Sequence, residues 1–322
     1  MTVAGSRIAG TGSAFPKRVV TNAELCRELE GKPGESVEGF SPEWIRQVTG
    51  IETRHFSGSD ETTSELATAA ARRALEAASL DASALDGILV ATCTPDTPMP
   101  AAAALVQAKL GARNAFAYDL NAACSGFHHA WATAHAFLAS GQANHLLVVG
   151  ADVLTKITDY TDRKSCILFG DGAGAMVLSR AENVPPSRFR LTADGEGAEM
   201  LRIPAGASGM AMKGHEIFKA SVRTMVDLSE KILADAGLTT ADIHHVVPHQ
   251  ANLRILERVA KQMKIPLDRF AMNITTRGNT SGATVPTALD EAVRSGKIKR
   301  GDRLLVPVFG AGLTAGAAIV TY

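Results

Sequence analysis

Short, almost continuously apolar runs recur along the chain, and alanine-rich stretches with helical spacing separate them. The strand-like runs cover residues 86–94, 145–152, 244–249 and 303–310. The helix-like stretches cover residues 63–80, 125–141, 217–237 and 252–263. A strand that is apolar on both faces must be covered on both sides, and alternating helices supply that cover. The pattern therefore predicts an α/β fold.

The two halves of the chain resemble each other. Residues 167–178 (ILFGDGAGAMVL) and 306–320 (VPVFGAGLTAGAAIV) each combine an FG-x-G turn, a run of small residues and an apolar strand. We therefore expect an internal duplication, with one half at 1–180 and the other at 181–322. Two polar, loop-like stretches interrupt the pattern, the proline-containing junction at 182–190 and a segment at 31–42 within the first half.

The composition narrows the class of protein. The chain has 322 residues, and its 33 basic residues balance its 33 acidic ones, so nothing global favours nucleic acid or a membrane surface. It contains no signal-like N-terminus and no run of about 18 apolar residues, the minimum for a membrane helix. The four cysteines form no CxxC motif, which is typical of reduced thiols. We expect a soluble, cytoplasmic protein.

The segment NAACSGF (121–127) holds the first candidate for chemistry. It joins a strand-like run to a helical pattern, so Cys124 is expected at a helix N-terminus. There the helix dipole favours the thiolate and should lower the pKa below its ordinary value of about 8.5. The alternative is a buried structural cysteine. The other three cysteines lack this small-residue turn and are interpreted as structural: Cys26, Cys93 and Cys166.

Two further segments carry candidate polar groups. His249 ends an apolar run in VVPHQANLRI, and strand ends of α/β sheets collect catalytic groups. Asn279 lies in the turn RGNTSGA and offers an amide donor that does not titrate. For either residue taken alone, a structural role is the better explanation. The pairs His128–His129 and His244–His245 do not form a metal site, because adjacent side chains on a helix or strand point apart.

Together these segments resemble β-ketoacyl-acyl-carrier-protein synthase III, a family of thiolase-fold condensing enzymes. The resemblance is carried by RIAGTGSAFPKRVVTN, EWIRQVTGIETRH, NAACSGF, VVGADVL, TDRKSCILFGDGAGA, HEIFKASV, VPHQANLRI, RGNTSGATVPTALDEAV and FGAGLTAG. It implies a five-layered αβαβα architecture built from two duplicated halves, and a homodimer.

The resemblance also implies a catalytic triad. Cys124 would take an acyl group from an acyl-CoA, and His249 and Asn279 would stabilise the enolate that forms when malonyl-carrier protein loses CO2. The backbone N–H groups of Cys124 and Ala311 would form the oxyanion hole. This chemistry needs neither a metal nor a redox cofactor.

Other residues fall on the substrate-binding positions of the family. The pantetheine and CoA tunnel would contain Trp44, Thr49, Arg163, Met212, Gly214, Phe218, Asn252 and Arg254. Leu201 and Met99 fall at the acyl pocket, and Met99 would reach the pocket of the second subunit. A flexible methionine there, in place of phenylalanine, would admit a longer or branched acyl group. Val48 and Ala315 depart from the family pattern, which has an arginine and an aromatic residue there.

One helix face indicates a docking surface for a partner. Arg254, Arg258 and Lys261 recur at helical spacing directly after His249 in an otherwise neutral protein. With Lys219, they would suit an acidic acyl carrier protein. An ordinary solvated helix face is the alternative.

The sequence leaves competing functions open. The leading interpretation is an initiator of fatty-acid synthesis. A rival is a secondary-metabolism acyltransferase of the same fold that transfers the acyl group without decarboxylation. A thiol hydrolase would use a similar cysteine and histidine with water as acceptor. A non-catalytic binding module is disfavoured, because all three catalytic positions are filled.

Overall fold

The computed structural model describes residues 5–30, 40–204 and 209–322. Most of the predicted loop at 31–42 lies outside the described residues. The first half of the chain builds a five-stranded sheet of β1 (Gly5–Ala14), β7 (Asp171–Ala181), β6 (His145–Val153), β4 (Gly87–Ala91) and β5 (Phe116–Leu120), in that spatial order. The pairs β1–β7 and β7–β6 are antiparallel, whereas β6–β4 and β4–β5 are parallel.

A second sheet comes from the other half of the chain. Its spatial order is β11 (His245–Val246), β12 (Arg303–Gly310), β13 (Thr314–Thr321) and β8 (Arg188–Ala193). The β11–β12 pair is parallel, and β12–β13 and β13–β8 are antiparallel. A parallel bridge from Val246 to Phe270 extends this sheet beyond β11. Strand order and direction thus repeat those of the first sheet, as an internal duplication requires.

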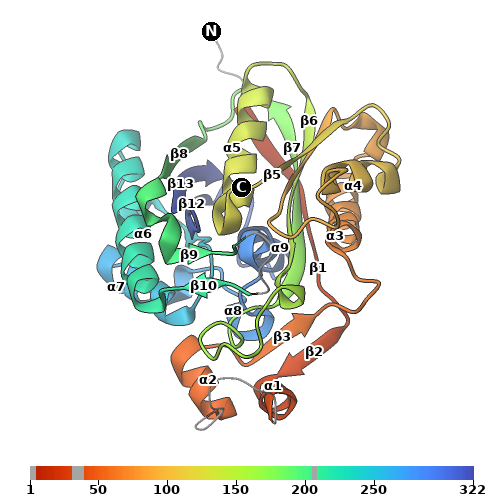
Figure 1. Ribbon diagram of the computed structural model, residues 1–322. Coiled ribbons are helices and arrows are strands. Elements are labelled where there is room, and N and C mark those ends of the chain that lie inside the picture. Colours follow the sequence, from red (N-terminus) through yellow and green to blue (C-terminus); the bar gives the residue numbers. More distant parts are fainter. Residues whose placement is uncertain (1–4, 31–39, 205–208) are drawn as a thin grey trace.

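Helices cover both sheets and also separate them. One outer layer contains α3 (Thr63–Ala78) and α4 (Ala102–Leu110), the central layer α5 (Gly126–Ala139) and α9 (Thr284–Arg294), and the other outer layer α6 (Gly214–Ala236) and α7 (Leu253–Met263). Figure 1 shows these three pairs at the right, middle and left of the molecule. The five-layered αβαβα architecture implied by the family resemblance is therefore confirmed.

The apolar strands are buried on both faces, as their composition predicts. In β4, Ile88 and Val90 pack against the outer layer of α3 and α4, whereas Leu89 and Ala91 pack against the central layer. The central cluster also contains Trp131 of α5, which is 1% exposed. Because side chains alternate along a strand, both sides of the sheet need cover, and continuous apolar runs result.

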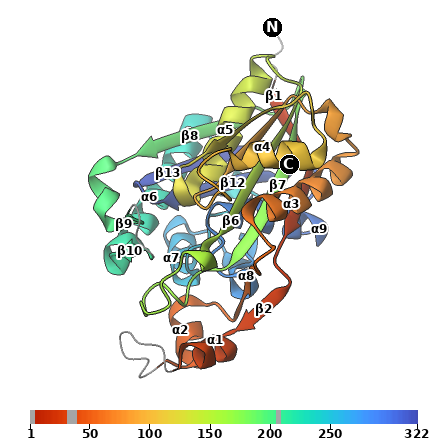
Figure 2. The same cartoon turned by 45° about the vertical axis from the view of Figure 1, so that its right-hand side comes forward.

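Smaller elements surround this frame. They are β2 (Arg18–Thr21), α1 (Asn22–Leu29), α2 (Pro42–Thr49), β3 (Thr53–Phe56), β9 (Leu201–Arg202), β10 (Ala211–Met212) and α8 (Ile274–Arg277). The short 3₁₀ helices are η1 (Ala82–Ala84), η2 (Ala123–Ser125), η3 (Leu154–Lys156), η4 (Gly195–Met200), η5 (Thr240–Asp242), η6 (Leu267–Arg269) and η7 (Ser281–Ala283). In both orientations α1, α2 and β2 lie together at the lower end of the molecule (Figure 1 and Figure 2).

Local signals explain where α2 begins and ends. The Ser41 side chain caps its N-terminus by accepting a hydrogen bond from the Trp44 N–H, and Pro42 occupies the first turn. Gly50 follows the helix with a φ of 77°, which glycine adopts without steric cost. These signals fix the orientation in which α2 meets α7.

Several sequence-based predictions need correction. The strand expected at 244–249 contains only two residues, His245–Val246, although the N–H groups of Val247 and His249 still donate to Leu305 O and Pro307 O of β12. The FG-x-G turn predicted at residues 169–172 is also wrong, because β7 already begins at Asp171. The junction is shorter than 182–190, because β8 begins at Arg188. Among the helices of the described residues, none is long and apolar enough to cross a membrane.

His128 is an unusual member of the central layer. It is fully buried in α5, and its ring meets that of Phe189 edge-on at 5.8 Å. The ring also occupies the space next to Gly316, where an added Cβ would lie 2.6 Å from the histidine Cδ2. Burial, and to a lesser extent the neighbouring His129, lowers the pKa of His128 to about 3. This histidine is therefore neutral in the folded protein at neutral pH.

We expect His128→Leu to make the free energy of unfolding less dependent on pH below about pH 6.5. An unfolded histidine has a pKa of about 6.5, so the folded state loses about 1.4 kcal/mol per pH unit as the pH falls below that value. The free energy of unfolding of the variant, relative to that of wild type, should therefore be about 2 kcal/mol higher at pH 5 than at pH 7.5. Urea unfolding at both pH values measures this difference. The exposed His215→Leu should show no such gain, and parallel curves for wild type and His128→Leu would contradict the argument.

Candidate active site

A cavity of about 900 Å³ lies at the meeting point of the two halves. Cys124, His249 and Asn279 all line it, so the fold brings the three predicted catalytic residues together. The rest of the lining is mostly apolar and includes Leu154, Leu168, Phe169, Met210, Met225, Ile255 and Phe309. Such a lining excludes water and strengthens the few polar contacts inside the cavity.

Cys124 lies in the turn that connects β5 to α5. Residues Ala123–Ser125 form η2, and α5 begins at Gly126, which places the thiol at the predicted helix start. Ala123 has a φ of 47°, and its N–H donates to Asn121 Oδ1 at 3.0 Å. The asparagine thereby holds a backbone conformation that costs free energy for a residue other than glycine.

The predicted lowering of the Cys124 pKa is wrong. Burial in the cavity raises the pKa of the thiol to about 11, while a hydrogen bond from Ser281 Oγ to the sulfur, at 3.5 Å, acts in the opposite direction. The loss of water outweighs the favourable position at the helix start. Cys124 is therefore a neutral thiol before substrate binds.

His249 follows β11 and is 4% exposed. Its backbone N–H donates to the carbonyl oxygen of Pro307 at 3.0 Å, and its Nδ1 lies 2.7 Å from Thr284 Oγ1. Burial lowers the pKa of His249 to about 4, so the ring is neutral at neutral pH. With Nδ1 engaged by Thr284, Nε2 is the ring nitrogen that can serve a ligand in the cavity.

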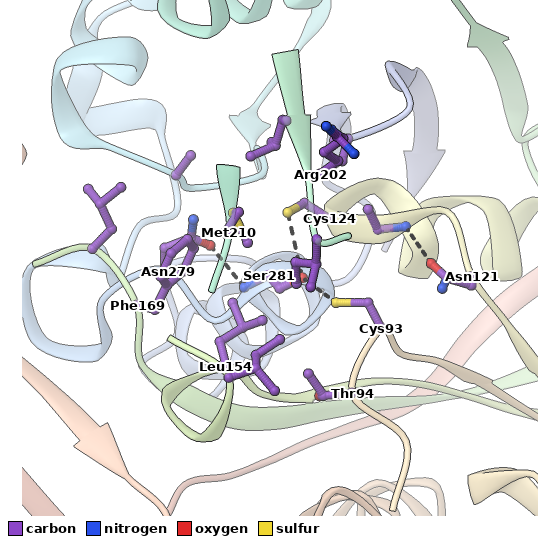
Figure 3. Close-up of a pocket in the computed structure, with 18 of the residues that line it drawn as sticks. Cys93, Thr94, Asn121, Cys124, Leu154, Phe169, Arg202, Met210, Asn279 and Ser281 are labelled. Atoms are coloured by element: carbon purple, nitrogen blue, oxygen red, sulfur yellow. Dashed lines mark hydrogen bonds between the residues drawn. The ribbon is translucent and has the colours of Figure 1, made fainter. Parts of the chain in front are cut away.

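The side-chain amide of Asn279 has a defined orientation. Its Oδ1 accepts a hydrogen bond from the Ser281 N–H at 2.9 Å, and a backbone N–H can only meet an oxygen (Figure 3). The Asn279 backbone is anchored as well, since its N–H donates to Leu168 O at 2.9 Å and its carbonyl accepts from the Gly170 N–H at 3.1 Å. The Nδ2 group is thus left as a donor for a ligand.

The turns that carry Cys124 and Asn279 are copies of each other. In each, an asparagine accepts a hydrogen bond from the N–H two residues on, and that residue has a positive φ of 47° at Ala123 and 54° at Ser281. A 3₁₀ turn and a central-layer helix follow in both cases. The letters NAAC and NTSG (279–282) contain the common asparagine, but only the backbone reveals the equivalence.

Cys93 belongs to the cavity, which its interpretation as purely structural missed. Its thiol donates to Asp152 Oδ1 at 3.3 Å and lies 3.8 Å from Ser281 Oγ (Figure 3). Burial first, and the Asp152 carboxylate second, raise the pKa of Cys93 well above its ordinary value. Two thiols therefore line one cavity, and Asp152 keeps one of them protonated. Nothing in the sequence near Cys93 signals this proximity.

The loop after β12 lies directly against the nucleophile turn. A Cβ added at Gly310 would be 3.0 Å from the Cys124 backbone nitrogen, so the close approach requires glycine. Thr314 Oγ1 lies 2.9 Å from Ala122 O and 2.8 Å from Ala311 O, which ties the two segments together. Ala311, the predicted second oxyanion donor, lines the cavity.

The predicted tunnel residues fall into two groups. Met212 lines the cavity from β10, and so does Leu201 of β9, which is predicted at the acyl pocket. Trp44 and Arg163 instead lie outside its lining, with the guanidinium carbon 4.5 Å from the centre of the indole. Arg163 thus covers one face of Trp44 in a cation–π contact, and a base would have to stack on the other face.

Two of the remaining tunnel residues, Asn252 and Arg254, hold the contact between α2 and α7. Asn252 caps α7 and donates from Nδ2 to Val48 O at 3.1 Å. Arg254 donates to Gln47 O at 2.9 Å and forms an ion pair with Glu257 at 2.7 Å. Thr49 is 1% exposed, and its hydroxyl donates to Ile45 O at 2.6 Å. These side chains have structural partners, and Gly214 and Phe218 belong to the first turns of α6.

The other positions are placed as follows. Met99 is 84% exposed and follows Pro98, which lines the cavity. Ala315 is buried against α6 instead of facing the cavity. Lys219, Arg258 and Lys261 are exposed. Within residues 5–30, 40–204 and 209–322, no group of three or more His, Cys, Asp or Glu side chains is arranged to hold a metal ion.

Comparisons with known proteins agree with this arrangement. The family model for the 3-oxoacyl-[acyl-carrier-protein] synthase III C-terminal region matches residues 233–322, and a second model of the same synthase matches residues 118–195. A β-ketoacyl-[acyl-carrier-protein] synthase III from Xanthomonas campestris is 45% identical over 98% of both chains.

Solved structures show the same architecture. The 3-oxoacyl-[acyl-carrier-protein] synthase III of Aquifex aeolicus superimposes with a TM-score of 0.92 at 41% identity, over 99% of this chain and 100% of that one. The priming β-ketosynthase of the R1128 polyketide pathway superimposes with a TM-score of 0.90 at 36% identity, over 98% of this chain and 96% of that one.

A duplicated five-layered fold of this kind defines a thiolase-fold condensing enzyme, a class that transfers acyl groups. Within that class, the matched models and the full-length similarity identify the relatives of this protein. The chain belongs to the 3-oxoacyl-[acyl-carrier-protein] synthase III family.

Proposed function

We propose specific roles for the cavity residues in the reaction of this family. As a member, the enzyme catalyses the decarboxylating condensation that initiates fatty-acid synthesis, joining an acyl group to malonyl-acyl-carrier protein. The observation that carries our assignment is the convergence of Cys124, His249 and Asn279 on one apolar cavity. Residues 1–180 would form the half that supplies the thiol, and residues 181–322 the half that supplies the two donors.

The first step is acyl transfer to Cys124. The thiol sulfur attacks the thioester carbonyl of acyl-CoA and loses its proton, the carbon–sulfur bond to CoA breaks, and CoA departs as the protonated thiol. The backbone N–H groups of Cys124 and Ala311 donate to the oxyanion of the tetrahedral intermediate. The close approach of Gly310 to the Cys124 turn supports this pairing of the two segments.

The second step is decarboxylation and condensation. His249 Nε2 and Asn279 Nδ2 donate to the thioester oxygen of malonyl-carrier protein, and CO2 leaves as the enolate forms. The enolate carbon attacks the acyl-cysteine carbonyl, and the Cys124 thiolate is the leaving group. For Nε2 to donate, Nδ1 must accept the Thr284 hydroxyl proton at 2.7 Å, so the hydroxyl turns from its other acceptor, Ser281 O at 3.0 Å, to the imidazole. Neutral donors suit this step because they add no charge that desolvation would penalise.

We expect Asn279→Ala to separate the two steps. Cys124 should still become acylated, because Asn279 does not act on acyl-CoA in our scheme. Decarboxylation should slow about 10²- to 10³-fold, the usual effect of removing one donor to a developing oxyanion. Mass spectrometry of the Cys124 adduct and release of labelled CO2 from malonyl-carrier protein measure the two steps separately. Cys124→Ala should abolish the adduct.

Other outcomes would redirect the assignment. Similarity to the R1128 priming ketosynthase makes a role in secondary metabolism the second candidate. Acyl transfer to an alcohol, an amine or a carrier-bound acceptor without CO2 release would favour a non-decarboxylating acyltransferase. Release of free acid at the same rate with and without malonyl-carrier protein would indicate a hydrolase.

We further propose that the substrate's pantetheine enters beside Met212 and that Leu201 contacts the acyl group. Both line the cavity, and the Trp44–Arg163 pair offers an aromatic face for the adenine of CoA, where stacking contributes about 1–3 kcal/mol. The remaining predicted contacts are Thr49, Gly214, Phe218, Asn252 and Arg254, of which buried Thr49 offers a ligand the least surface. The two-step chemistry requires neither a metal nor a redox cofactor.

A second copy of the chain is proposed to cover β5. This strand is the edge of the first sheet, and none of its five residues is buried. Its Phe116 is 38% exposed and packs beside Tyr118 and Phe137. An uncovered apolar edge strand is a pairing surface. In the dimer implied by the family resemblance, the exposed Met99 of each copy would reach the acyl pocket of the other.

We expect Met99→Phe to narrow acyl selectivity. A rigid ring should occupy space that the flexible methionine leaves to the end of a longer or branched acyl chain. The variant should keep acetyl transfer and lose acylation of Cys124 by longer acyl-CoAs, measured by mass spectrometry with a mixture of donors. The exposed Leu191→Phe on β8 serves as the control. The hypothesis fails if wild-type enzyme accepts acetyl-CoA only.

The acyl carrier protein is proposed to dock on exposed basic residues of α6 and α7. Lys219, Arg258 and Lys261 are exposed, whereas Arg254 already pairs with Glu257. The structure therefore makes Arg258 and Lys261 the stronger candidates for attraction to an acidic partner. A carrier-bound substrate, balanced charge and free cysteines together favour the cytoplasm, with no role for nucleic acid or a membrane.

We expect the double variant Arg258→Glu, Lys261→Glu to raise the KM for malonyl-carrier protein about fivefold, the effect of losing about 1 kcal/mol of exposed charge attraction. Acylation by acyl-CoA should be unchanged, and added salt should reduce the difference between the two enzymes. Steady-state kinetics at two salt concentrations measure both effects. Lys299→Glu, elsewhere on the surface, is the control, and an equal change in that variant would count against docking here.

A further inference from the structure

Ser281 lies at the centre of the catalytic cavity, although it is not one of the predicted catalytic residues. It is fully buried and lines the cavity between the two catalytic turns. Its N–H holds Asn279 Oδ1 at 2.9 Å, and its carbonyl lies 3.0 Å from Thr284 Oγ1, which in turn contacts His249. Its backbone thus connects the two donors of the triad.

The Ser281 hydroxyl makes a separate contact with the nucleophile. Its Oγ donates to Cys124 Sγ at 3.5 Å and lies 3.8 Å from Cys93 Sγ, as the dashed lines in Figure 3 show. The Cys93 thiol proton is directed to Asp152 Oδ1 at 3.3 Å. Because Asp152 holds Cys93 as a thiol, Cys124 is the sulfur of this pair that becomes an anion.

We propose that Ser281 is a catalytic residue whose hydroxyl stabilises the Cys124 thiolate. The proposal rests on the proposed role of Cys124 as the acylated nucleophile. Ser281 keeps its proton throughout and transfers none. During acylation it donates to the sulfur as the thiol proton leaves, and during condensation it donates again when the carbon–sulfur bond breaks and the thiolate is released. Hydrogen bonds to a charged acceptor are about twice as strong as neutral ones.

The local backbone supports a role for the side chain. Ser281 has a φ of 54°, a conformation in which glycine would be free of steric cost. The equivalent position in the other turn, Ala123, has no hydroxyl and precedes the nucleophile itself. At this position of the two turns, a hydroxyl is therefore present only in the one that faces Cys124. Burial raises the pKa of Cys124, and this hydroxyl is the leading influence that lowers it.

The test measures the reactivity of Cys124 in Ser281→Gly and Ser281→Ala. Both variants remove the hydroxyl, and glycine also accepts the positive φ, so the backbone contacts to Asn279 and Thr284 persist. We expect the Cys124 pKa to rise by about one unit. Because a more basic thiolate is also more nucleophilic, alkylation by iodoacetamide at about pH 8 should slow about three- to fourfold. Mass spectrometry resolves the Cys124 peptide from those of the other cysteines.

Ser221→Ala is the matched control, since Ser221 lines the same cavity and its hydroxyl donates to Phe218 O at 2.9 Å. Slower alkylation and a shifted pH profile in both Ser281 variants, but not in Ser221→Ala, would support the proposal. Unchanged Cys124 alkylation in Ser281→Gly would overturn it, as would an equal loss in the control. Absence of an acyl adduct on wild-type Cys124 would instead overturn the proposed function, so the two failures are distinguishable. If Ser281→Gly fails to fold, as judged by circular dichroism, Ser281→Ala decides.

Discussion

The arrangement of the active site depends on one buried carboxylate. Asp152 is fully buried, and its Oδ1 accepts hydrogen bonds from Thr92 Oγ1 at 3.1 Å, the Cys93 N–H at 2.9 Å and Thr94 Oγ1 at 3.0 Å. Its Oδ2 accepts from the Gly282 N–H at 3.2 Å. A buried carboxylate is tolerable only with such donors. Because these donors come from both halves of the chain, Asp152 ties the Asn279 turn of the second half to residues 92–94 of the first.

The apolar packing of the central helices also positions the catalytic residues. The central helices α5 and α9 contribute to one apolar cluster that touches both sheets, and each begins directly after a catalytic turn. Packing of the helices therefore sets the direction in which Cys124 and Asn279 enter the cavity. The cavity itself is apolar, which keeps His249 neutral and strengthens each hydrogen bond that the remaining donors make to a ligand.

Much of the fold was predictable from the sequence because its signals are local. Continuous apolar runs predict doubly covered strands, and the observed bounds of β6 and β12 agree with the predicted 145–152 and 303–310 to within a residue. The site was predictable only in part. The small-residue turn around Cys124 indicates a nucleophile, but contacts between distant segments place Cys93 and Ser281 beside it. The sequence-based prediction of the Cys124 pKa was wrong for the same reason, since the loss of water around the thiol depends on atoms from the whole cavity.

The repeated turn has a consequence for how reactivity arises during folding. Each half of the chain supplies the same backbone device, yet one copy presents the sulfur and the other presents the amide and the hydroxyl. Neither copy is chemically complete. An unassembled or half-folded chain therefore holds its thiol apart from the amide and hydroxyl donors, and the set of groups that condensation requires is complete only once the two copies meet. The protein thus makes its condensation chemistry conditional on the correct assembly of its own two halves.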